Sequence, residues 1–126
     1  MRETSLRYDL IFADAGIADG IPEHHTIDPF FSALRERLRP DGVLVVNLGL
    51  DDRSNADITR RIATAFGADA CARVRTPEDA NTLVFATRRS VVPKTAQLRA
   101  RAEAIDRRRL LPYALTPLAG QLGRCL

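Results

Sequence analysis

Two apolar runs decide the fold of this chain: Tyr8-Asp9-Leu10-Ile11-Phe12-Ala13-Asp14 and Val43-Leu44-Val45-Val46-Asn47-Leu48. Runs of this length and composition are typical of parallel strands that are covered on both faces. About thirty residues separate them, which is enough for the crossover helix of a βαβ unit. Asp14 ends the first run at the carboxyl end of its strand, which is the edge of an open α/β sheet where ligands bind. We therefore predict a parallel pair of strands with Asp14 at its ligand-binding edge.

Apolar residues at helical spacing predict three helices between and after these strands. The predicted helices cover residues 28–38, 54–66 and 94–109. Pro29 in the first turn and Gly42 in the turn Arg-Pro-Asp-Gly mark the two ends of the first helix. Ser54 and Asp57 resemble a capping box and mark the start of the second. The apolar faces are predicted to consist of Phe30, Phe31, Leu34 and Leu38 in the first helix and of Leu98, Ala102 and Ile105 in the third.

Two further strands are predicted at residues 70–75 and 82–87. The link between them is too short for a parallel crossover, so they should form an antiparallel hairpin. The element order β-α-β-α-β-β-α is that of the second half of a class I methyltransferase-type sheet. We therefore predict an α/β fold with a partial Rossmann-like sheet, whose parallel strands close in an antiparallel hairpin, plus a C-terminal helix. Residues 1–93 would hold the sheet, and residues 94–126 a helical tail that packs on it.

The charge of the 126-residue chain is unevenly distributed. The net charge is +3, yet residues 8–34 contain five acids and no Lys or Arg, so the rest of the chain carries +8. An acidic loop at the ligand edge of a basic chain favours a cationic small molecule as partner; the plain alternative is an ordinary solvated loop. The arginines of the tail lack the interleaved aromatic residues of a nucleic-acid site, which favours a solvated helix face and no nucleic-acid partner.

The sequence contains no apolar run long enough to span a bilayer, and its N-terminus lacks the apolar region of a signal peptide. We therefore expect a single cytoplasmic domain without membrane contact. Cys71 and Cys125 match no metal-binding spacing and are expected to be free thiols. His24 and His25 lack the spaced acids or cysteines of a metal site, so no metal is predicted.

Taken together, these residues resemble the spermidine synthase family, which comprises the aminopropyltransferases and their bacterial relatives. The resemblance covers residues 7–88 and rests on segments 8–15, 21–24, 30–31, 38–47 and 81–86. The most specific part is the strand ending in Asp14 followed by Ile-Pro-Glu-His at positions 21–24. The turn Arg-Pro-Asp-Gly is shared with many methyltransferases.

The resemblance implies transfer of an aminopropyl group from decarboxylated S-adenosylmethionine, or a related use of S-adenosylmethionine, to a polyamine acceptor. Asp14 would be the catalytic carboxylate, because an alkylammonium with a pKa of about 10 must lose a proton before it attacks carbon. Asp19 and Glu23 would bind the distal ammonium of the acceptor, and Asp14 with Ala15 would border the cosubstrate. The alternative for Asp14 is a strand-end cap on loop amides; for Asp19 and Glu23 ordinary loop carboxylates are the favoured reading.

The chain also departs from the family. Spermidine synthases carry a second aspartate just beyond the first, where this chain has Gly16 and Ile17. No G-x-G-x-x-G loop for a nucleoside cofactor is present, and few residues precede the first strand. We therefore expect a truncated, split or decayed form that binds no adenosyl cofactor stably by itself. Its strand 8–14 would be an exposed sheet edge, available for self-association or for a complementary N-terminal half.

Two other functions stay open at this point. One is a non-catalytic fragment or partner-binding module, and the other is an S-adenosylmethionine-dependent methyltransferase-like protein, since the sheet alone does not distinguish methyl from aminopropyl transfer. A neighbouring reading frame that encodes a glycine-rich βαβ half would favour a split enzyme. Binding of S-adenosylmethionine and of its decarboxylated form to the purified chain would separate these classes.

Overall fold

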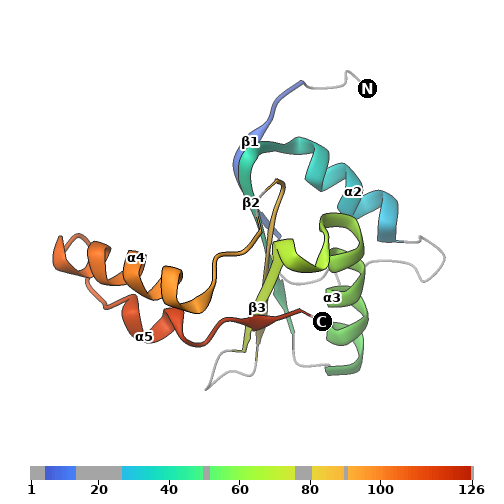
Figure 1. Ribbon diagram of the computed structural model, residues 1–126. Coiled ribbons are helices and arrows are strands. Elements are labelled where there is room, and N and C mark those ends of the chain that lie inside the picture. The colour runs from blue at the N-terminus through green and yellow to red at the C-terminus, as the bar shows by residue number, and fades with distance from the viewer. Residues whose placement is uncertain (1–4, 14–26, 50–51, 76–80, 90, 126) are drawn as a thin grey trace.

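The computed structural model describes residues 5–13, 27–49, 52–75, 81–89 and 91–125 of the chain. They form an α/β fold in which a five-stranded mixed sheet has helices on both faces (Figure 1). The strands are β1 (Tyr8–Ala13), β2 (Leu38–Leu48), β3 (Cys71–Arg75), β4 (Thr82–Thr87) and β5 (Gly123–Arg124). The helices are α2 (Ile27–Arg37), α3 (Asp52–Phe66), α4 (Thr95–Arg107) and α5 (Thr116–Ala119), with a 3-10 turn, η1, at Ala68–Ala70.

The strand order is β1-β2-β4-β3-β5, with one parallel pair and three antiparallel pairs. β1 and β2 run parallel, and β4 runs against β2 with Val84 opposite Val46. β3 and β4 form the predicted hairpin, in which Arg75 lies opposite Thr82. The predicted parallel pair β1–β2 and the predicted antiparallel hairpin β3–β4 are therefore confirmed, and the arrangement is compatible with a partial Rossmann-like sheet.

The hydrophobic core lies between the sheet and the helices α2 and α3. Leu44, Val46 and Leu48 alternate along β2 and point into this core, where they meet Phe31 of α2 and Ile62 of α3. The period of two in burial along β2 is the expected pattern of a strand with one face against a helical layer. Burial of these side chains is the main stabilising contribution to the fold.

The opposite face of the sheet is covered in part by α4 and α5, which lie on the other side of the sheet from α2 and α3 (Figure 1). The third predicted helix is thus confirmed, with Ala102 buried and Leu98 half-buried. Ile105 also lies on the side of the helix that faces the sheet, since it lines the same apolar cavity as Leu98 and Ala102, although 39% of this residue is exposed. An apolar cavity of about 440 Å³ separates the helix pair from Leu83 and Phe85 of β4.

The turn Arg-Pro-Asp-Gly differs from its prediction. β2 begins at Leu38, so the turn lies inside the strand as a bulge: Tyr8 pairs with Leu38, and Leu10 with Val43. Leu38 is buried as predicted, but as the first residue of β2. Phe30, which was expected on the buried face of α2, is 43% exposed.

The start of α3 also differs from its prediction. The helix begins at Asp52, so Ser54 lies inside it and does not cap it. Asp57 forms ion pairs with Arg60 and Arg61 on the solvent side instead. No helix in the described part of the chain is long and apolar enough to cross a membrane.

Candidate functional site

The residues predicted to form the site, Asp14, Ala15, Asp19 and Glu23, lie outside the described residues, as do His24 and His25. The structure does describe the strands that lead to this position. Ala13, the last residue of β1, pairs with Val46, and β2 ends two residues later at Leu48. The carboxyl ends of the two parallel strands therefore meet at one edge of the sheet, as a ligand-binding edge requires.

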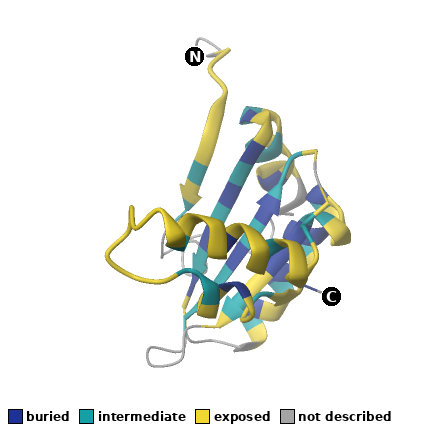
Figure 2. Cartoon of the chain, turned by 60° about the vertical axis from the view of Figure 1, so that its left-hand side comes forward, coloured by how far each residue is buried: buried dark blue, intermediate teal, exposed yellow. Residues whose placement is uncertain are grey.

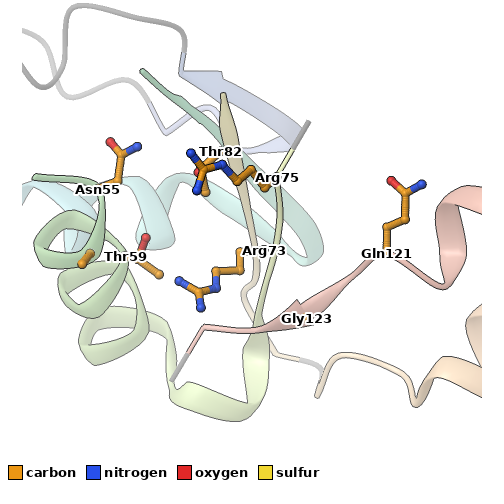
Figure 3. A pocket seen from close by; sticks show the side chains of 8 residues that line it. Asn55, Thr59, Arg73, Arg75, Thr82, Gln121 and Gly123 are labelled. Carbon is orange, nitrogen blue, oxygen red and sulfur yellow. The ribbon is translucent and has the colours of Figure 1, made fainter. Parts of the chain in front are cut away.

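A polar pocket of about 380 Å³ lies between α3 and β3 on the core side of the sheet (Figure 3). Its lining includes Asn55, Thr59, Arg73, Arg75, Thr82 and Gln121. Thr82 pairs with Leu48 and Arg75 with Thr82, so the pocket opens near the same edge of the sheet as the carboxyl end of β2.

Asn55 and Thr59 reach the pocket from one face of α3, because residues four apart in a helix lie one above the other. Both are almost completely buried, with 5% and 2% of their surfaces exposed. Asn55 Nδ2 donates a hydrogen bond of 2.5 Å to the carbonyl oxygen of Gly49. In the part of the chain that the structure describes, Asn55 Oδ1 and Thr59 Oγ1 have no hydrogen-bond partner. A buried polar atom in this state costs about 1–3 kcal/mol of stability.

Arg73 and Arg75 reach the pocket from β3. Alternate residues of a strand point to the same face, which puts both guanidinium groups on the side of α3. Figure 3 shows both side chains directed from β3 toward α3, whereas Gln121 lies apart from them. Among the residues that the structure describes, the pocket lining contains two arginines and no acidic side chain. This arrangement is suited to an anion.

Two thiols lie next to the pocket. Cys71 of β3 and Cys125, directly after β5, are buried free cysteines, which confirms the prediction from the sequence. The hydrogen bond between them raises the pKa of Cys71, and burial adds to this effect. The same bond lowers the pKa of Cys125 against the opposing effect of burial, and the charge of Arg73 lowers it as well. Cys71 is therefore the donor and Cys125 the thiol that ionises first.

Among residues 5–13, 27–49, 52–75, 81–89 and 91–125, no three His, Cys, Asp or Glu side chains gather in a group that could hold a metal ion. The polar pocket itself was missed in the sequence. The available signals were Arg-Val-Arg in a predicted strand and Asn55 with Thr59 at helical spacing. Each is weak alone, because alternating charge on a strand usually indicates a solvated face.

Comparison with known proteins shows a similarity to one family of transferases. The chain is 32% identical over 84 residues to a probable polyamine aminopropyl transferase of Bifidobacterium longum (strain NCC 2705). The match covers 64% of this chain and 19% of the relative, so the chain spans about a fifth of that protein's length. No protein-family model matches the chain. The similarity agrees with the resemblance to the spermidine synthase family and supports it at the level of the family only.

Proposed function

We propose that the chain is related by descent to the polyamine aminopropyltransferases and corresponds to the acceptor-binding half of the catalytic sheet of such an enzyme. The similarity to the Bifidobacterium longum protein carries this proposal. The arrangement of the sheet supports it, since parallel strands followed by an antiparallel hairpin are compatible with the second half of a class I methyltransferase-type sheet. The tail after residue 93 would be a helical extension of this half.

The reaction would be a nucleophilic displacement at carbon. The lone pair of a polyamine nitrogen attacks the aminopropyl carbon bound to the sulfonium of decarboxylated S-adenosylmethionine. The C–S bond breaks, its electrons pass to sulfur, and methylthioadenosine leaves. Asp14 would orient the ammonium and accept its proton, directly or through water. Asp19 and Glu23 would bind the distal ammonium group of the acceptor.

The residues that bind the nucleoside would lie outside these 126 residues. Nucleoside binding in this fold needs backbone amides from a glycine-rich loop and an acid for the ribose hydroxyls, and the sequence contains no such loop. β1 is the last strand at one end of the described sheet, so a complementary N-terminal half would pair with its outer edge. Either such a half or a second copy of the chain would pair there.

Polyamine binding by the chain alone tests the acceptor site. Titration with putrescine and spermidine, followed by amide chemical shifts, is expected to give saturable shifts that Asp14→Asn weakens at least tenfold. Asp41→Asn removes the same charge at an exposed position of the turn and serves as the matched control. Equal effects of the two substitutions would contradict a specific acceptor site.

Transfer activity tests whether the chain needs a separate nucleoside-binding part. Methylthioadenosine formation from decarboxylated S-adenosylmethionine and putrescine is expected to be absent for the chain alone. Mixing or co-expression with the part of the Bifidobacterium longum relative outside the matched segment should restore it, and Asp14→Asn should remove the restored activity. Restored activity that is insensitive to Asp14→Asn would exclude the proposed role of this residue.

A further inference from the structure

The polar pocket between α3 and β3 lies outside the proposed aminopropyl-transfer chemistry, and its residues define a ligand of their own. We propose that it binds a phosphate group that carries an O–H donor, either free hydrogen phosphate or a small phosphate ester with a neighbouring hydroxyl. The inference rests on the Arg73 guanidinium group of β3 and on the buried side chains of Asn55 and Thr59, whose oxygens have no partner among the described residues.

The positive charge of the pocket selects for an anion. Arg73 and Arg75 lie two residues apart on one face of β3, about 7 Å from each other along the strand. A tetrahedral anion between these side chains and α3 can accept hydrogen bonds from a guanidinium fork and from the Thr59 hydroxyl. Asp57 of α3 is already paired with Arg60 and Arg61.

Asn55 narrows the choice of anion. Its Nδ2 donates to the carbonyl oxygen of Gly49, which fixes the orientation of the amide and leaves Oδ1, on a residue that lines the pocket, as an acceptor with no partner among the described residues. An acceptor beside an anion is unfavourable unless the ligand supplies a proton. Hydrogen phosphate and hydroxylated phosphate esters have such an O–H group near neutral pH, whereas sulfate has none. The pocket is therefore expected to prefer phosphate to sulfate.

Thr59 allows a second test of the proposed phosphate site. Thr59 is 2% exposed, and its buried hydroxyl has no partner among the described residues, so this group destabilises the ligand-free chain. Thr59→Val keeps the shape and removes this group. We expect the melting temperature of the ligand-free protein to stay the same or rise, while phosphate affinity falls several-fold. A variant that binds phosphate more weakly without losing stability would indicate that the hydroxyl serves the ligand and not the fold.

The test is a calorimetric and amide-shift titration of the full chain with sodium phosphate, glycerol 3-phosphate and sodium sulfate at matched ionic strength. Phosphate is expected to bind with a dissociation constant of about 1 mM or lower and more tightly than sulfate. Tighter binding of inorganic phosphate would identify the free anion as the ligand. Tighter binding of glycerol 3-phosphate would identify an ester.

Arg73→Gln should weaken phosphate binding at least tenfold, because it removes a charge-assisted donor. Arg108→Gln removes the same charge at an exposed residue after α4 and should leave affinity unchanged. Asn55→Ala should abolish the preference for phosphate over sulfate; if that variant does not fold, the Thr59→Val comparison decides. Absence of saturable phosphate binding, equal affinity for sulfate, or equal losses in the two arginine variants would overturn the proposal.

Discussion

Gly42 shows how a single residue sets the geometry of the bulge in β2. A Cβ atom at this position would lie 2.9 Å from the carbonyl oxygen of Tyr8 and 3.0 Å from that of Arg39. Both neighbours are backbone atoms, so neither can move without shifting a strand. The backbone of β1 can approach β2 at the bulge because position 42 has no side chain.

Gly42→Ala is therefore expected to lower the free energy of unfolding by about 1–3 kcal/mol through this overlap. Urea denaturation followed by circular dichroism measures the loss. Gly49→Ala is the matched control, because no described atom lies within 4 Å of its added methyl group. That variant should be unchanged or slightly more stable. Similar losses in both variants would show that chain flexibility, and not the close approach at Gly42, is responsible.

The pKa directions of Cys71 and Cys125 predict how the pair titrates. Cys125 has a lowered pKa, so it adds stability above the pKa of an unfolded cysteine, and this contribution is lost as pH falls through its folded value. Cys71 has a raised pKa and acts in the opposite sense: its contribution is present below the unfolded pKa and is lost as pH rises through the folded one. As pH rises, one thiol of the pair should lose its proton at a lower pH than a free cysteine and the other at a higher pH.

Thiolate ultraviolet absorbance against pH checks this expectation. We expect one thiolate per folded chain to form below the pH at which a free cysteine ionises, and the second only when the protein unfolds. Cys71→Ala removes the donor and should move the first ionisation to higher pH. Two thiolates that appear together in the range of free cysteine would refute the hydrogen-bonded pair.

At the scale of elements, Asp106 joins the two helices of the tail. Its carboxylate accepts hydrogen bonds from the N–H groups of Leu115 (2.8 Å) and Thr116 (3.0 Å) and from the Thr116 hydroxyl (2.6 Å). These bonds lower the pKa of Asp106. The connection between α4 and α5 is therefore fully present above the pKa of an unfolded aspartate and is lost as pH falls through the folded value.

Asp106→Ala should release the start of α5 from α4 and expose residues 108–122 to proteases. Limited trypsin digestion with mass spectrometry identifies the cleaved arginines. Glu103→Ala is the control, because its pair with Arg107 is exposed and 3.9 Å long and contributes little. Hydrogen exchange of the wild type at acidic pH should resemble that of the variant. Equal protection of residues 108–122 in both variants would show that Asp106 does not connect the helices.

The elements that could be predicted from the sequence are those with a periodic pattern. Apolar runs in the sequence indicate β1 to β4. The short link between β3 and β4 indicates that these two strands run antiparallel. β5 and α5 have two and four residues and leave no pattern of their own. β5 exists because Arg124 pairs with Ala72, a contact between residues far apart in the sequence. The start of β2 was also missed, since a turn sequence alone does not show that a bulge can accommodate it.

The polar pocket could not be predicted for the same reason. It combines α3, β3, the start of β4 and the segment before β5. The sequence places Arg73 with Arg75 on one strand face and Asn55 with Thr59 on one helix face. It does not say that these two faces meet. The opposite holds for the acidic loop around Asp14. Its carboxylates are evident from the sequence, whereas its residues lie outside the described part of the structure.

At the scale of the whole molecule, the sheet is covered unevenly. On the β1 side, Tyr8, Leu10 and Phe12 are 46%, 59% and 57% exposed on the face away from α2 and α3. Figure 2 shows β1 as a largely exposed strand at the border of the sheet. Among the described strands β1 has a neighbour on one side only. An apolar face and an open edge thus occur on the same strand, which is the combination that promotes association between chains.

We therefore expect the purified chain to self-associate through β1, with a weight-average mass that rises with concentration in sedimentation equilibrium. Leu10→Lys puts a charge in the centre of this surface and should weaken association at least tenfold, equivalent to about 1.4 kcal/mol. Leu110→Lys places the same charge on a residue after α4 that is 65% exposed, and it should have no effect. A wild-type chain that stays monomeric at all concentrations, or a Leu110→Lys variant that dissociates as readily as Leu10→Lys, would exclude β1 as the interface. If a complementary N-terminal half pairs with β1, adding it should compete with self-association of the wild type, because both events use the same edge.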